Sequence, residues 1–372
     1  MQADIVAIAI AFILGFGARF VALPPLVGYL VAGFALYAAG MRPSVTLLEF
    51  SEMGVTLLLF SIGLKLRLGS LLMPQIWGVA SLHMAITVAL VSLFLYGLGI
   101  AGFALFADLD LQPLMLIAFA LSFSSTVFAV KVLEGKGEMG SFYGRIAIGI
   151  LIMQDIAAVI FLAVSTGKMP SLWALLLFAL IPLKPVLHKM LEKSGHGELQ
   201  VLFGLTLALG GAQVFELAGV KGDLGALILG VLLASHVRAS ELARQLLGFK
   251  DLFLVGFFLN IGLSGPLDLD AIWIALLLLL LVPLKTGLFF LLLSAFRLRV
   301  RTSLLTSLAL ANYSEFGLIV AAIAVSSGWL APEWLIIIAI ALSLSFIIAA
   351  PLNSAAYGLY ARFGSGLAGF ES

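Results

Sequence analysis

Long apolar runs separated by short polar breaks fill most of the sequence. The run at 271–296 is apolar on every face of a helix, whereas a strand of a membrane barrel alternates apolar and polar positions over about 10 residues. Because a spanning helix needs about 20 apolar residues, the pattern predicts an all-α polytopic membrane protein. We expect 13 transmembrane helices, near residues 4–22, 25–40, 50–65, 74–100, 112–133, 141–166, 171–192, 197–218, 222–238, 245–264, 271–296, 302–328 and 332–361.

The composition supports this interpretation. Of the 372 residues, 63% are hydrophobic and 10% are charged, against roughly 45–50% and about 25% in soluble globular domains. Since a water-soluble fold cannot bury so much apolar surface, the bilayer must solvate most of the chain. The absence of cysteine excludes disulfides and thiolate ligands, and a net charge of +1 gives no reason to expect nucleic acid as a partner. The first apolar run has no basic segment before it, so we expect a retained span rather than a signal peptide.

The distribution of Lys and Arg between the loops orients the expected spans. Of the 20 basic residues, 16 fall in loops on one side of the membrane and 3 on the other, while Lys285 lies within a span. This bias predicts an N-terminus outside and a C-terminus in the cytoplasm. A missed span would destroy the alternation, so the bias also supports the number of spans.

Two short patterns recur in the two halves of the chain. Gly28-Tyr-Leu-Val-Ala-Gly33 resembles Gly225-Ala-Leu-Ile-Leu-Gly230 at an offset of 197 residues, and Ile62-Gly63-Leu64 resembles Ile261-Gly262-Leu263 at an offset of 199. Matching spans are seven apart, and an odd shift reverses direction in the membrane, so the sequence predicts two inverted six-helix repeats joined by a linker helix. Chance is the alternative, because Gly-x4-Gly is common in apolar helices.

The repeats divide the chain into four parts. We expect the first repeat at 1–170, the linker helix at 171–193, the second repeat at 197–361 and a cytoplasmic tail at 362–372. Inverted repeats with broken helices are typical of secondary transporters, whose binding sites lie near the membrane midplane.

Ionisable residues inside the membrane are costly and are functional candidates by default. Asp155, preceded by Gln154, lies in the middle of the sixth span. A buried carboxylate has a raised pKa, so one group can hold either a proton or a bare cation, which is the minimum requirement for exchange. Lys285 in the eleventh span and Glu315 in the twelfth are candidate supporting charges. The alternatives are a structural pair of Asp155 with Lys285, and a Glu315 that only stabilises the crossing of two helices.

Polar residues interrupt the fifth and twelfth spans. Ser124, Ser125 and Thr126 offer hydroxyl and freed carbonyl oxygens, the hard ligands that alkali cations prefer. The alternative is ordinary back-bonding of these hydroxyls to the preceding turn. Asn312 and Ser314 occupy the corresponding break in the twelfth span. No nucleotide-binding, zinc or nucleophile motif occurs in a credible context, so we expect neither enzyme activity nor a cofactor.

These residues resemble the monovalent cation:proton antiporter superfamily, and most closely its Kef-type potassium:proton antiporters. The resemblance rests on Ala120-Leu-Ser-Phe-Ser-Ser-Thr126 and Gln154-Asp155-Ile-Ala-Ala158, with support from 28–33, Lys285 and Glu315-Phe316. It covers nearly the whole chain. It implies an NhaA/NapA-like antiporter fold, in which the fifth and twelfth helices are broken and cross.

The resemblance further implies a homodimer in the cytoplasmic (inner) membrane of a bacterium, surrounded by lipid. Spans 1–3 and 8–10 would form the dimer scaffold, and spans 4–6 and 11–13 the ion-binding core. The exchange site maps to Asp155, which with Gln154 would bind K⁺ in exchange for a proton. The Gln-Asp pair implies electroneutral exchange of one cation for one proton, so that K⁺ and H⁺ are substrates.

Two departures from the family pattern bear on gating and ion preference. Gly63-Leu-Lys-Leu66 stands where Kef proteins tend to have Gly-Leu-Glu-Leu, and Tyr313-Ser-Glu-Phe316 where they tend to have Gly-Gly-Glu-Phe. Full-length Kef proteins also carry a C-terminal nucleotide-binding regulatory domain that these residues lack, so we expect a truncated chain or a shorter relative. Three alternatives stay open: a sodium:proton antiporter, a channel-like cation efflux protein, and an organic-anion transporter whose site would depend on helix N-termini and Lys285.

Overall fold

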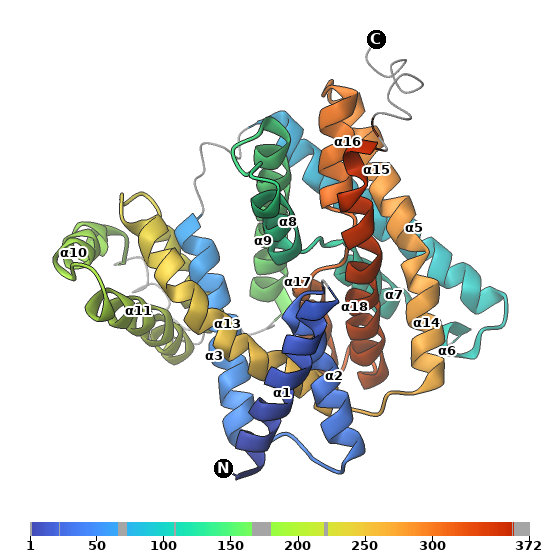
Figure 1. Cartoon of the computed structure of the whole chain (residues 1–372), viewed down its shortest axis with the longest axis horizontal. Helices are drawn as coiled ribbons and strands as arrows, with labels where there is room; N and C mark the ends of the chain where they lie inside the picture. The colour runs from blue at the N-terminus through green and yellow to red at the C-terminus, as the bar shows by residue number, and fades with distance from the viewer. Residues whose placement is uncertain are drawn as a thin grey trace. The chain divides into compact units, whose positions relative to one another are not determined.

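The computed structural model describes residues 2–21, 23–65, 73–107, 109–165, 180–218, 222–358 and 360, and these residues form helices and connections without a strand. Their contacts divide the chain into two compact units. Unit 1 comprises residues 1–14, 28–69 and 159–264, and unit 2 comprises residues 15–27, 70–158 and 265–372. The helices are labelled in Figure 1.

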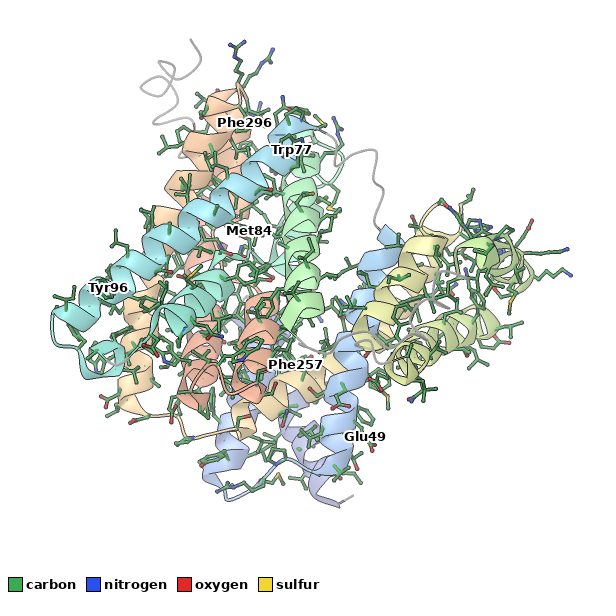
Figure 2. All side chains as sticks on the ribbon, turned by 180° about the vertical axis from the view of Figure 1, so that it is seen from behind. Glu49, Trp77, Met84, Tyr96, Phe257 and Phe296 are labelled. Atoms are coloured by element: carbon green, nitrogen blue, oxygen red, sulfur yellow. The ribbon has the colours of Figure 1, made fainter. Side chains whose placement is uncertain are left out.

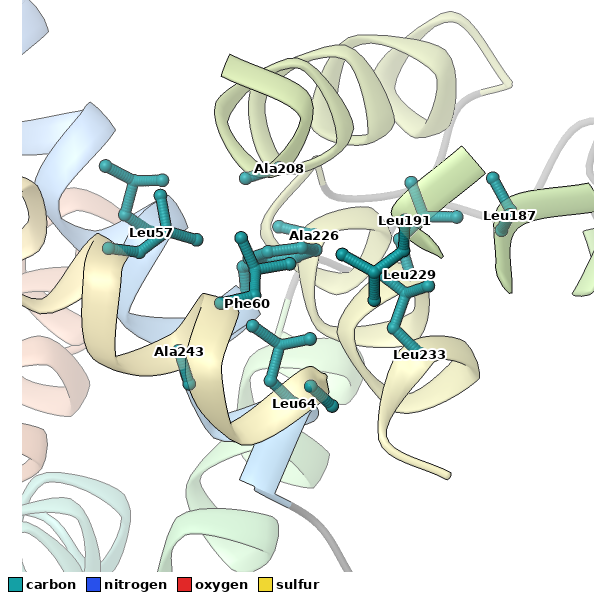
Figure 3. Close-up of a cluster of buried hydrophobic side chains, with 13 residues drawn as sticks. Leu57, Phe60, Leu64, Leu187, Leu191, Ala208, Ala226, Leu229, Leu233 and Ala243 are labelled. Carbon is teal, nitrogen blue, oxygen red and sulfur yellow. The ribbon is translucent and has the colours of Figure 1, made fainter. Parts of the chain in front are cut away.

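Unit 1 is built on long apolar helices. Its helices are α3 (Val45–Lys65), α10 (Leu180–Lys193), α11 (Glu198–Leu217), α12 (Gly222–Leu233) and α13 (Ala239–Leu263), and it shares α1 (Gln2–Phe20) and α2 (Pro25–Ala38) with unit 2. Figure 3 shows its main hydrophobic cluster, where Phe60 and Leu64 of α3 meet Leu229 of α12 and Ala243 of α13. The van der Waals packing of these side chains, which drives helix association in a membrane, fixes the spacing of the helices.

Glycines set two close helix crossings within unit 1. A Cβ built on Gly33 of α2 would lie 2.7 Å from Gly262 Cα of α13, and one on Gly63 of α3 would lie 2.9 Å from Gly230 Cα of α12. No other residue lets two helix backbones approach this closely, which is why small residues are enriched at such membrane interfaces. Four of the six glycines in the recurring patterns are therefore contact positions.

Unit 2 contains the interrupted helices. Its helices are α5 (Pro74–Ile100), α6 (Ala104–Ala107), α7 (Leu111–Ser122), α8 (Thr126–Gly135), most of α9 (Phe142–Ser165), α14 (Leu269–Leu279), α15 (Leu281–Ala295), α16 (Val300–Ala309), α17 (Glu315–Ser326) and α18 (Pro332–Ser354). The breaks expected in the fifth and twelfth spans are present, between α7 and α8 and between α16 and α17. In the eleventh span the expected single helix is divided at Leu280 into α14 and α15. Pro283 explains this division, since proline has no N–H to donate to the preceding turn and its ring clashes with the carbonyl four residues earlier.

The helix α5 has the features of a membrane span. Trp77 and Tyr96 are about half exposed near its two ends, with Met84 between them (Figure 2). Nineteen residues of helix rise about 28 Å, close to the roughly 30 Å hydrocarbon core, and such aromatic residues concentrate at membrane interfaces. Near the same end as Trp77, Phe296 packs against α5, because a Cβ on Gly78 would lie 2.7 Å from its ring.

In the part of the chain that the structure describes, 7 helices are long and apolar enough to cross a membrane. Four shorter apolar helices accompany them, namely Pro25–Ala38, Leu111–Ser122, Leu224–Leu233 and Glu315–Ser326. The multi-pass α-helical membrane architecture is thus shown, while the expected number of 13 spans stays a prediction. Residues 171–179 of the expected linker helix, Leu66 and the expected tail at 362–372 lie outside the described residues.

Candidate ion-binding site

Two interrupted helices meet in the interior of unit 2. The backbone is extended at Phe123 after α7, and it is again non-helical between Leu310 and Ser314 before α17 begins. Each break exposes the last carbonyls of one half-helix and the first N–H groups of the next, which have no partner within their own helix. In a membrane interior these groups must find partners inside the protein.

The two breaks hydrogen-bond to each other directly. The Ser125 N–H donates to Asn312 Oδ1 at 2.7 Å, and Ser124 Oγ donates to the Leu310 carbonyl at 2.9 Å. Ser125 Oγ donates to Glu315 Oε2 at 2.9 Å and accepts from the Phe128 N–H at 3.2 Å. The predicted polar residues of the fifth and twelfth spans are therefore brought together, although they are nearly 190 residues apart in sequence.

Glycine permits the same approach between α7 and α17. A Cβ built on Gly317 would overlap the Ala120 carbonyl oxygen and lie 3.1 Å from its carbon. The partner is backbone, which cannot rotate away as a flexible side chain can. Gly317 was not singled out in the sequence, where its role had no local signal.

Lys285 bridges both breaks from α15. Its Nζ donates to the carbonyls of Leu121 (3.3 Å), Phe123 and Asn312 (2.9 Å). The side chain is 3% exposed and lies over the Tyr313 ring, 5.3 Å from its centroid. The sequence suggested a carboxylate partner, and the hydrogen bonds described for Lys285 go to backbone carbonyls at the C-terminal end of α7 and in the break that follows α16. A cation is favourable there, because helix C-termini carry partial negative charge.

Glu315 lies at the N-terminal ends of the half-helices that follow the breaks, whereas Lys285 lies at the C-terminal ends of those that precede them. Glu315 is the first residue of α17 and is 2% exposed. Its carboxylate accepts a hydrogen bond from the hydroxyl of Ser125, the residue that precedes α8. A carboxylate is favourable at helix N-termini for the same electrostatic reason. Ser314 precedes it as the helix N-cap, and its Oγ accepts from the Phe316 N–H at 3.2 Å. Lys285 and Glu315 thus balance the charges of the four helix ends.

Gln154 connects the sixth span to the first break. Its Oε1 accepts from the Ser124 N–H at 2.9 Å, and its Nε2 donates to the Ser122 carbonyl at 3.3 Å. Asp155 follows it on α9 and is 3% exposed. Thr126 opens α8, and its buried Oγ1 has no hydrogen-bond partner among the described residues. Orphaned buried hydroxyls are uncommon, so this oxygen is a candidate ligand for a cation.

His83 of α5 contacts the helix that carries Lys285. Its ring stacks on Phe289 of α15, and its Nε2 lies 3.2 Å from the Lys285 carbonyl. The histidine therefore supports the backbone of the helix that carries Lys285. Tyr313 does so for α14, donating its hydroxyl to the Leu278 carbonyl at 2.6 Å.

A fold with crossed, interrupted helices around buried charges defines a class of ion-coupled membrane transporters. The chain aligns with a solved structure of the sodium proton antiporter MjNhaP1 from Methanocaldococcus jannaschii with a TM-score of 0.65, covering 95% of this chain and 96% of that one at 14% identity. This likeness shows the fold.

Residues 6–354 match the family model described as sodium/hydrogen exchanger, transmembrane, and the chain belongs to that family. It is 30% identical over 350 residues to the glutathione-regulated potassium-efflux system protein KefC of Salmonella heidelberg (strain SL476), and 29% identical over 353 residues to the protein of that name from Enterobacter sp. (strain 638). These alignments cover 87% and 88% of this chain and support a Kef-type member of the family. The chain spans 55% of the length of these relatives.

Proposed function

We propose that this protein is a secondary antiporter that exchanges K⁺ for H⁺ at Asp155 by alternating access. The observation that carries the proposal is a buried carboxylate next to two hydrogen-bonded helix breaks whose ends are already balanced by Lys285 and Glu315. Asp155 is a buried carboxylate, and such a group can hold either a proton or a cation. Competition of the two for one carboxylate couples their movements.

In this proposal Gln154 and the segment from Ser124 to Thr126 help to bind the cation. The unpartnered Thr126 hydroxyl supports this role, as does the Gln154 amide, which ties the sixth span to the first break. Lys285 then acts as a fixed brace for the broken helices, which its three carbonyl contacts support. The Gln-Asp pair would exchange one cation for one proton.

The proposal includes two inverted repeats within 13 spans, with the N-terminus outside and the C-terminus in the cytoplasm. The reciprocal glycine crossings support it: α2 of the first repeat meets α13 of the second, while α12 of the second meets α3 of the first. If α2 corresponds to α12 and α3 corresponds to α13, the first contact becomes the second when the two repeats are interchanged. A two-fold relation between the repeats requires this. The division into two compact units supports a scaffold and a moving core, and we further propose a homodimer formed by the scaffold in a bacterial inner membrane.

Potassium is proposed because the KefC relatives are named as potassium-efflux system proteins. The test is dye-monitored proton flux in proteoliposomes that receive pulses of K⁺, Na⁺ or Li⁺. We expect K⁺ to drive proton movement in the parent and not in Asp155→Asn. Asp270→Asn is the matched control, since it makes the same chemical change at an exposed carboxylate.

Each result has a definite meaning. A response to Na⁺ alone keeps the mechanism and replaces the cation. Cation flux that persists in Asp155→Asn without proton coupling refutes the antiporter and favours a channel.

A further inference from the structure

An open cavity of about 720 Å³ lies within unit 2. It is lined by Arg19, by residues 23–25, by α8 and by the C-terminal end of α18. Its volume falls in the roughly 300–1,000 Å³ range of pockets that hold small molecules. The proposed exchange does not use this cavity.

The charged side chains that line the cavity are both basic in the part of the chain described here. Lys136 Nζ donates to the Asn353 carbonyl at 2.8 Å and lies 5.4 Å from the centroid of the Tyr357 ring. These contacts hold the ammonium in place, and an ammonium has three hydrogens to donate. Arg19 is exposed and supplies a second cation. The cavity is therefore positive.

The region also contains a carboxylate, that of Glu138, which interacts electrostatically with Lys136. Glu138 accepts hydrogen bonds from the hydroxyls of Tyr143 (2.5 Å) and Tyr357, and it does not line the cavity. Two basic groups thus face the cavity without an acidic partner in its lining, which favours an anionic ligand.

Apolar side chains make up most of the remaining wall, among them Leu23, Phe128, Val132 and Ala350. A small hydrophilic anion would lose hydration against such a surface, whereas an amphiphile can satisfy both parts of it. Basic pockets between membrane helices are suited to the headgroups of anionic lipids.

We propose that this cavity binds an anionic phospholipid, with its phosphate between Arg19 and Lys136 and an acyl chain along Leu23, Phe128 and Val132. This site goes beyond the proposed exchange function. The lipid contacts α8, the helix that begins at Thr126 in the candidate ion site and leads to Lys136.

The test is a lipid titration of the purified full chain in detergent, read by native mass spectrometry and by thermal stability. Phosphatidylglycerol and phosphatidylcholine with identical acyl chains are compared for the parent and for Arg19→Gln/Lys136→Gln. The matched control is Lys189→Gln/Lys193→Gln, which removes the same charge from exposed positions of α10. We expect the parent and the control to prefer phosphatidylglycerol, and the double variant to bind it roughly tenfold to thirtyfold more weakly.

Two further variants guard against a folding defect. Lys136→Arg keeps the charge and is expected to keep the preference, and Arg19→Gln changes an exposed side chain and is expected to lose part of it. Equal binding of the two lipids by the parent, or an unchanged preference in the double variant, overturns the proposal. Inorganic phosphate or glycerol phosphate that stabilises the parent as well as phosphatidylglycerol does would also overturn it, because the site would then take free anions.

Discussion

Gly317→Ala tests whether the close approach of α7 and α17 holds the candidate ion site together. An alanine Cβ at this position would overlap the Ala120 carbonyl oxygen. Carbon and carbonyl oxygen normally approach to about 3.3 Å, so the two helices must separate by about 1 Å. The matched control is Gly287→Ala on α15, where an added Cβ has nothing within 4 Å.

The magnitude follows from two opposing effects. Replacing glycine by alanine inside a helix gains about 1 kcal/mol from helix propensity at either position. Overpacking typically costs about 1–3 kcal/mol, and the upper part of that range applies at Gly317 because its partner is backbone. We therefore expect Gly287→Ala to be neutral or slightly stabilised, and Gly317→Ala to lose about 1–2 kcal/mol.

The assay combines thermal unfolding in detergent with proton exchange in proteoliposomes. Since a displacement of about 1 Å in a preorganised site commonly costs on the order of 100-fold in rate, exchange by Gly317→Ala is expected to fall at least tenfold. Equal stability and equal exchange for the two alanine variants would refute the idea that this contact positions the breaks.

Three further outcomes follow from the contacts described. Lys285→Met should lower thermal stability by several kcal/mol, because each buried carbonyl left without a donor costs about 1–3 kcal/mol, and stability equal to the parent's would exclude the bracing role. Gln154→Leu should weaken cation-driven exchange more than it changes thermal stability, which a KM measurement with K⁺ checks against melting curves. Burial alone would raise the pKa of Glu138, but hydrogen bonds from Tyr143 and Tyr357 lower it below its ordinary value of 4.5. The stability that Tyr357→Phe removes should therefore be complete above pH 4.5 and shrink as the pH falls further, and a difference independent of pH in melting curves would contradict this.

The sequence predicted the features that depend on the solvent around each residue. Uninterrupted apolar runs identified membrane helices, and the polar residues at Ser124 and Asn312 marked the two breaks, because a lipid-exposed helix excludes such groups. The recurring glycines predicted a repeat, but the sequence did not show that Gly33 meets Gly262. The division of the eleventh span was also missed, although Pro283 supplied a local signal.

The tertiary structure decided which groups meet inside the membrane. Backbone carbonyls occur at every residue and leave no mark in the sequence, so the three acceptors of Lys285 could not be foreseen, and carboxylates were suggested instead. Gly317 and Ala120 are nearly 200 positions apart, and only packing brings them together. The sequence by itself determined that this chain spans a membrane and carries Asp155, Lys285 and Glu315 within it. The folded structure determined that Lys285 and Glu315 stabilise opposite ends of broken helices, because that depends on the orientation of backbone dipoles in space.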